Sequence, residues 1–138
     1  MAWEQPLFSV SFKTAKDLSA RQWQVVRLTT AGKITYLTCG AGNPALGILQ
    51  DAPTCGMEGN VMIAGISKVK AAGAVGYGGA LSQQINSTSY PGMLVAITTA
   101  MKGAVHPVGR ALQAAAQAGD IIPAIINFFP QSGNSCAL

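Results

Sequence analysis

Apolar and polar residues alternate near the start of the chain, and this pattern predicts an extended strand. In the run LFSVSF, Phe8, Val10 and Phe12 lie on one side, and Leu7 lies with two serines on the other. No neighbouring segment offers a hairpin partner. Residues 1–16 therefore form either an extended apolar arm that pairs elsewhere or the first strand of the domain's own sheet.

Further runs rich in β-branched and aromatic residues predict short strands separated by glycine-rich turns. They are residues 23–30, 34–39, 47–50, 60–73, 93–101 and 121–129. Within one of these runs the apolar phase slips at Gly65, and a glycine at such a slip predicts a β-bulge or a sharp bend. A hairpin turn is expected at residues 31–33.

One segment predicts a helix. Residues 111–118 are rich in alanine and glutamine, which are strong helix formers, and Gly119 stands where a left-handed C-terminal cap belongs. Several short β segments against one helix leave too few helices for parallel crossovers. The sequence therefore predicts an α+β fold that is mostly β. We expect a small antiparallel domain, barrel-like or sandwich-like, with one alanine-rich helix and an extended N-terminal arm.

Composition adds an expectation about association. Only 10% of the 138 residues are charged and 49% are apolar, so few charges are available to keep a free surface apart from its neighbours. We therefore expect an oligomer or a component of a larger assembly. The net charge of +4 reflects a shortage of acids, and Lys68 and Lys70 are the nearest approach to a basic patch. Nucleic-acid binders concentrate charge and interleave it with aromatics, so no direct nucleic-acid partner is expected.

The glycines of residues 47–79 raise the question of a phosphate-binding loop. Dinucleotide and P-loop motifs need a helix directly after their glycines, because the helix N-terminus binds the anion. Here the run Gly76-Tyr77-Gly78-Gly79 leads into a polar segment instead. The glycines are therefore predicted to form turns and bulges, and Tyr77 is either a packed residue or an exposed contact.

Catalytic and metal chemistry find little support. Asp51 and Glu58 are the only carboxylates close in sequence, and Asp51 is expected to close a local turn. The candidate nucleophiles and metal ligands are Cys39, Cys55, Cys136 and His106. They lack C-x-x-C or H-x-x-x-H spacing, so neither a metal site nor a cofactor is expected. A Cys–His nucleophile stays open because the sequence does not show spatial proximity, but we expect a protein that is not an enzyme.

No targeting or membrane segment is expected. The start of the chain carries Glu4 and has no apolar core of a signal peptide. The longest apolar stretch is interrupted by Pro123 and is too short to cross a bilayer.

Several segments of the chain resemble the capsid cement, or head decoration, proteins of tailed bacteriophages. A Gly-apolar-apolar-Gln-x-x-Pro segment spans residues 47–53, followed by Gly56 and a V-x-x-x-G strand at residues 61–65. A V-x-A-x-G turn lies at residues 69–73, and the closing G-x-A-L-x-A-A segment begins at Gly109. The resemblance covers roughly residues 17–128. The chain departs from the family in a long segment between Gly79 and the closing segment.

The resemblance implies a non-enzymatic protein on the outer surface of an icosahedral head. It would bind the major capsid protein as a homotrimer at threefold and quasi-threefold positions, stabilise the shell against internal DNA pressure, and be made in the host cytoplasm. The implied organisation is an arm at residues 1–16, a compact decoration domain at 17–129 and a flexible tail at 130–138. The arm residues expected to bind the capsid are Trp3, Leu7, Phe8, Val10 and Phe12. The alternative is a self-assembling virion component, such as a tail or fibre-associated domain.

Overall fold

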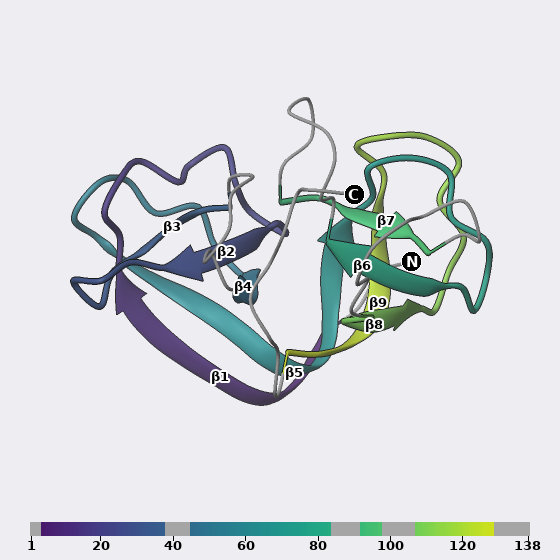
Figure 1. Ribbon diagram of the computed structural model, residues 1–138, viewed down its shortest axis with the longest axis horizontal. Helices are drawn as coiled ribbons and strands as arrows, with labels where there is room; N and C mark the ends of the chain where they lie inside the picture. Colours follow the sequence, from purple (N-terminus) through teal and green to yellow (C-terminus); the bar gives the residue numbers. More distant parts are fainter. Residues whose placement is uncertain (1–3, 38–44, 84–91, 98–106, 129–138) are drawn as a thin grey trace.

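The computed structural model describes residues 4–37, 45–83, 92–97 and 107–128, and these residues form a single curled antiparallel sheet (Figure 1). The strands are β1 (Gln5–Lys13), β2 (Val25–Leu28), β3 (Ile34–Tyr36), β4 (Ala45–Leu49), β5 (Glu58–Lys70), β6 (Ala80–Gln83), β7 (Leu94–Ala96), β8 (Gly109–Ala111) and β9 (Ile121–Asn127). Their order across the sheet is β3-β2-β4-β5-β9-β8-β6-β7, and β1 pairs with β5 outside this path.

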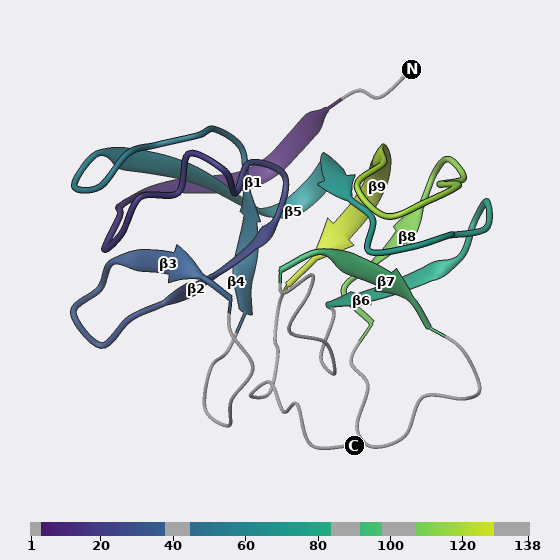
Figure 2. The ribbon, with the colours of Figure 1, turned by 90° about the horizontal axis from the view of Figure 1, so that it is seen from above.

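The long strand β5 joins the two halves of the molecule. Its first half pairs with β1 and β4, and its second half pairs with β9. Figures 1 and 2 show β5 passing from the lobe that contains β2, β3 and β4 into the lobe that contains β6, β7 and β8. The strand bends at Gly65, where φ is +131° and the register with β1 shifts nearby. The prediction of a β-bulge or a sharp bend at this glycine is confirmed as a bend, with irregular pairing beside it.

The sheet curls into an open half-barrel, and the two lobes are tied together across its inside. The Val25 N–H donates to the Gly92 carbonyl at 2.7 Å, and the Lys70 N–H donates to the Trp23 carbonyl at 2.9 Å. Trp23 adopts a positive φ of 67° at this junction. Strands β3 and β7, at the two ends of the order, do not pair with each other in the described residues, so the barrel is not closed.

Buried aliphatic residues fill both lobes. In the first lobe the fully buried residues include Val25, Ile34, Ile48, Leu49 and Val61. The second lobe is filled by Val69, Leu81, Leu94, Ile122 and Ile126. The second half of β5 alternates buried and partly buried residues, as the period-2 pattern predicts, whereas β2, β4 and the middle of β5 carry consecutive buried residues.

The predicted helix at residues 111–118 is wrong, and so is the α+β class: the described residues contain no helix and are all β. The backbone of this segment bonds to other segments instead of to its own preceding turn. The Ala115 N–H donates to the Val75 carbonyl at 3.0 Å, and the Val75 N–H donates back to the Ala115 carbonyl at 2.9 Å. Gly119 does adopt a left-handed φ of +92°, but it belongs to the turn that precedes β9.

The strands predicted around β2, β3, β4, β5, β7 and β9 are confirmed, as is the turn that joins β2 to β3. Of the two placements that the sequence leaves open for the N-terminal segment, the structure shows pairing within the domain's own sheet. Here β1 runs antiparallel to β5 from Gln5, opposite Ile66, to Lys13, opposite Glu58. The predicted tail at 130–138 lies outside the described residues.

Candidate functional site

The structure separates the five predicted capsid-binding residues into two kinds. Val10 and Phe12 are partly buried and pack against the core. Leu7 and Phe8 lie further towards the start of β1 and are exposed, with 81% and 47% of their surface accessible. Trp3 lies outside the described residues. Only part of the predicted set is therefore presented outward within the described structure.

Leu7 is exposed because β1 is irregular where it crosses the bend in β5. Pro6 pairs with Gly65 and Phe8 pairs with Ala64, so Leu7 has no partner of its own in the register. A Cβ added to Gly65 would lie 2.5 Å from the Gln5 carbonyl oxygen and 2.7 Å from the Leu7 nitrogen. Glycine at this position therefore lets the two backbones approach closely, which places Leu7 over the outside of the bend.

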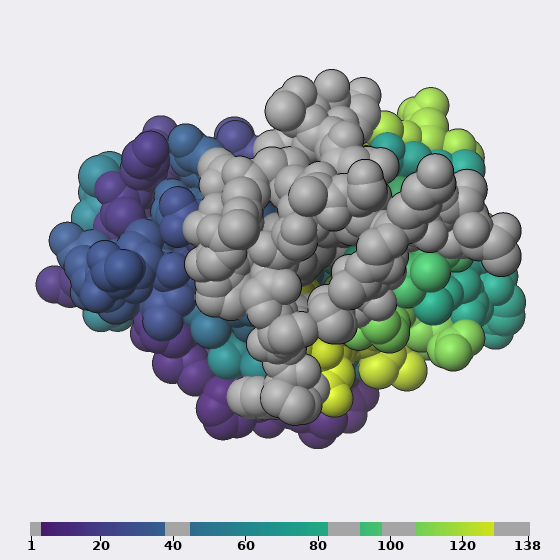
Figure 3. Space-filling view, in the orientation of Figure 1, coloured from purple at the N-terminus to yellow at the C-terminus, as the bar shows by residue number. Residues whose placement is uncertain are grey.

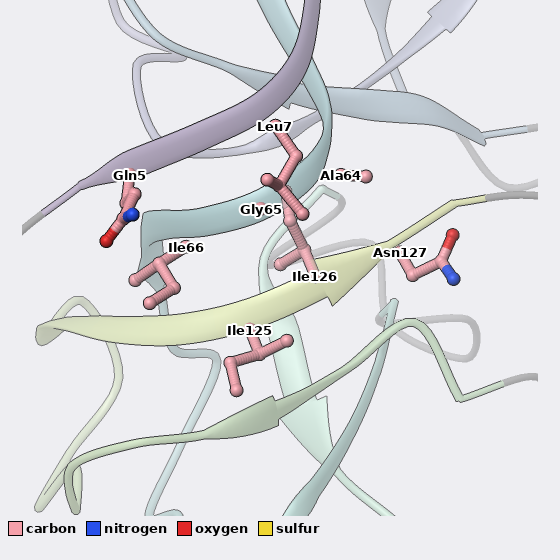
Figure 4. Close-up of a pocket in the computed structure, with 8 residues that line it drawn as sticks. All are labelled: Gln5, Leu7, Ala64, Gly65, Ile66, Ile125, Ile126 and Asn127. Atoms are coloured by element: carbon pink, nitrogen blue, oxygen red, sulfur yellow. The ribbon is translucent and has the colours of Figure 1, made fainter.

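An apolar groove lies beside Leu7 (Figure 4). Its volume is about 410 Å³, and its lining comes from β1, β5 and β9. Ile66 of β5 lies directly opposite Ile125 of β9 in the register, so their side chains share the outer face of the sheet. Ile125 is 49% exposed. In the space-filling view, β1 and β9 lie close together along the lower edge of the molecule (Figure 3).

This surface collects most of the exposed apolar bulk of the described residues. The described residues include seven large hydrophobic residues that are exposed, and four of these belong to β1 and β9. They are Leu7, Phe8, Ile121 and Ile125. Leu7 and Ile125 line the groove, Phe8 lies opposite Ala64 of the lining, and Ile121 lies further along β9, opposite Lys70. Exposed apolar residues that gather on one face of a small domain mark a contact site more often than scattered single residues do. We call this surface, with Ile66, the outer face.

Charged side chains border the outer face. Lys68 and Lys70 follow Ile66 at two-residue spacing on β5, and Arg110 of β8 lies opposite Ile125. The Lys68 Nζ lies 3.4 Å from the Glu4 carboxylate and 5.1 Å from the centre of the Trp23 ring. The Arg110 guanidinium donates to the Gly78 carbonyl at 2.7 Å. The border is therefore mainly cationic.

The described members of the groups considered for catalysis or metal binding, Asp51, Glu58 and Cys55, do not form a metal-binding cluster. Among the described residues, no three His, Cys, Asp or Glu side chains come close enough to hold a metal ion. Asp51 accepts hydrogen bonds from the Asn60 N–H at 3.2 and 3.3 Å, so its expected local turn is replaced by a contact across the loop. Cys55 is exposed and free. Cys39, Cys136 and His106 lie outside the described residues.

Tyr77 lies in an exposed turn. The run Gly76-Tyr77-Gly78-Gly79 forms a turn, with the Gly79 N–H donating to the Gly76 carbonyl at 3.0 Å, and Tyr77 is 83% exposed. Tyr77 is therefore an exposed residue and not a packed one.

The part of the chain that the structure describes has no helix of the length and apolar character needed to cross a membrane.

Sequence reasoning missed Ile66 and Ile125 as surface residues. The apolar run at residues 121–129 predicts a strand but does not by itself separate its two faces. In β9, residues 122–124 and Ile126 are buried, whereas Ile121 and Ile125 are exposed. The signal that could have found them is the two-residue period of a strand, which is hidden when both faces carry isoleucine.

Fold and surface together define an open all-β half-barrel domain with an apolar outer face. This fold is shared with the crystal structure of the N base of head fibre gp8.5 in bacteriophage phi29. The TM-score is 0.59, and the match covers 88% of this chain and 94% of that chain at 14% sequence identity. No protein-family model matches the chain, and no curated protein matches it. At this identity the likeness establishes a shared fold.

Proposed function

We propose that this chain is a structural protein of a bacteriophage particle, of the fibre-associated kind, and that it attaches to the outside of the head. The observation that carries the proposal is the shared fold with a head fibre base. The match takes in nearly the whole of both chains, so it concerns the complete half-barrel rather than a common hairpin. The outer face supplies a surface of the kind that an attachment domain needs.

The proposal includes the absence of catalysis. The described residues bring together neither a nucleophile with a base nor a cluster of metal ligands, which supports a role in binding. We propose no cofactor, no direct nucleic-acid partner and no membrane association. A homotrimer remains part of the proposal because the low share of charged residues favours association.

A second candidate function is head decoration, in which the protein clamps neighbouring major capsid proteins against internal pressure. The specific observation in its favour is the order of short motifs over roughly residues 17–128 that resembles cement proteins. The two candidates share a location on the head and differ in what the protein does there. A cement protein strengthens the shell itself, whereas a fibre base anchors something that projects from it.

Cryo-electron microscopy of particles made with and without this protein tests the proposal. We expect difference density on the outside of the head at symmetry-related positions. Density confined to the tail, or particles identical in the two preparations, would contradict it.

The same particles separate the two candidates. Heads that lose their DNA on mild heating only when the protein is missing indicate a cement protein. Heads of equal thermal resistance that lose a projecting fibre indicate a fibre base.

A further inference from the structure

The outer face combines an apolar centre with an unequal charge balance, and this balance limits what can cover it. Lys68, Lys70 and Arg110 border the face, and only Glu4 opposes them. Asp120 is adjacent to Ile121 in sequence, but its carboxylate accepts hydrogen bonds from the Ala116 and Gln117 N–H groups in the turn before β9. The face therefore carries more positive than negative charge.

A second copy of this chain is a poor source of the missing negative charge. The chain has five carboxylate side chains, and all five belong to the described residues. Only Glu4 forms an ion pair with a cation at the border of the face, Lys68. Asp17, Asp51 and Asp120 keep their charge and accept backbone N–H hydrogen bonds in their own turns and loops, and none of them lines the groove. The fifth, Glu58, lies opposite Lys13 in the register of β1 and β5. Two copies meeting through this face would bring lysines towards lysines.

Nucleic acid matches the surface less well. Among the described residues, the groove lining contains no aromatic residue, and Phe8 is the one aromatic side chain of the outer face. Single strands are bound by several aromatic side chains on which successive bases stack. The Trp23 ring is the nearest aromatic group with a cation beside it, and Lys68 already lies over it. Tyr77 is exposed but belongs to the turn at residues 76–79, outside the groove lining.

We propose that the outer face binds a different protein through a segment in which aliphatic side chains are flanked by carboxylates. An aliphatic side chain of the partner enters the groove between Leu7 and Ile125. The flanking carboxylates meet Lys70 and Arg110 at the border. This deepens the proposed function and rests on it in one respect: on a phage head, the partner is an acidic, apolar stretch of the shell protein.

A pair of peptides tests the chemistry without a particle. One is an acetylated, amidated pentapeptide in which leucine and isoleucine alternate with glutamate, and the other has glutamine at each glutamate position. Methyl NMR of the full chain is recorded during both titrations at low and high salt. The glutamate peptide is expected to shift the methyl signals of Leu7, Ile66 and Ile125. It should bind at least about fivefold more tightly than the glutamine peptide at low salt, with the difference shrinking at high salt.

Three variants locate the effect. I125A should weaken glutamate-peptide binding roughly tenfold, as removal of a central contact does. K70E should weaken it roughly fivefold and should reduce its salt dependence. M57A is the matched control, because Met57 is an exposed apolar residue (59%) in the turn before β5, away from the groove lining. Native NMR spectra of each variant establish that the fold is retained.

The outcomes that overturn the inference are distinct. Equal binding of the two peptides removes the charge argument, and shifts confined to residues outside the face remove the site. A fall in oligomer size of I125A by light scattering would assign the face to contacts between copies. Binding of a DNA oligonucleotide that K70E abolishes and I125A leaves unchanged would assign it to nucleic acid.

Binding to heads that lack the protein then separates this inference from the proposed function. Wild-type protein that fails to bind heads contradicts the proposed function, while the peptide results still decide the chemistry of the face. Wild-type and I125A proteins that bind heads equally contradict the inference and leave the proposed function standing. We expect M57A to bind as wild type and I125A to bind roughly tenfold more weakly.

Discussion

The substitution Gly65→Ala is the most direct test of the bend that organises this fold. The added methyl group would lie 2.5 Å from the Gln5 carbonyl oxygen, 2.7 Å from the Leu7 nitrogen and 3.0 Å from the Pro6 Cα. All three are backbone atoms of β1, so no side-chain rotation relieves the contact. The φ of +131° is in addition a conformation that L residues rarely adopt.

Two costs therefore combine at this position. Holding a non-glycine residue in such a conformation costs about 1–3 kcal/mol. Forcing a methyl group into a filled space costs about 1–3 kcal/mol more. We expect Gly65→Ala to lower the free energy of unfolding by about 2–6 kcal/mol, a large share of the roughly 5–15 kcal/mol of a typical domain.

Urea unfolding followed by tryptophan fluorescence measures this loss, and two other glycines serve as matched controls. At Gly109 the added Cβ would also meet backbone, the Ile125 carbonyl oxygen, but without a positive φ, so about 1–3 kcal/mol is expected. At Gly73 nothing lies within 4 Å, so alanine should be nearly neutral or slightly stabilising.

The order of the three losses in free energy of unfolding tests whether β1 lies across the bend at Gly65. If Gly65→Ala unfolds at the same urea concentration as Gly73→Ala, β1 does not lie across the bend as described. If instead β1 detaches in the Gly65→Ala protein, the native state buries less surface and the slope of free energy against urea falls. Gly109→Ala should keep the wild-type slope.

The remaining predictions concern other parts of the chain. Ala114→Gly should cost less than about 0.5 kcal/mol in urea unfolding, whereas a helix interior at this exposed position would lose about 1 kcal/mol. The backbone N–H and then the side chain of Ser19 hold the pKa of Asp17 below its ordinary 3.8, so the stability this carboxylate adds is present above pH 3.8 and is lost as the pH falls through the folded-state pKa. In Ser19→Ala the backbone N–H remains, so an NMR titration should show the pKa of Asp17 rising only part of the way back. Cys55 should react with iodoacetamide in the native protein, as mass spectrometry of the alkylated peptide would show.

Strand prediction succeeded where β-branched and other apolar residues gather between turn residues, as they do in β5 and β9. It failed at residues 111–118 because alanine's helix propensity is a local property, while the conformation is decided by the distant Val75, whose backbone pairs with Ala115. Differences in helix propensity are only a few tenths of a kcal/mol per residue, so such tertiary pairing overrides them. No local stretch of the sequence shows that Val75 lies beside Ala115.

The candidate site was predictable only in part, for a related reason. Leu7 and Phe8 could be named because an apolar strand without a hairpin partner stands out in the sequence. The groove that they border needs Ile66 and Ile125, which come from strands far away in the sequence and are placed together by the pairing of β5 with β9. Sequence periodicity gives the faces of each strand, whereas the juxtaposition of faces is a property of the sheet.

The central position of β5 also constrains how the chain can acquire its structure. Gln5 pairs with Ile66, and Lys70 pairs with Ile121, so the strand in the middle of the sheet finds its two long partners near opposite ends of the described chain. During synthesis, the second half of β5 has no partner until β9 has left the ribosome. Sheets dominated by such non-local pairs fold in milliseconds to seconds, because loop closure must precede the gain from pairing. We therefore expect the half-barrel to complete only after β9 has left the ribosome, with the edge of β5 open to other strands until then.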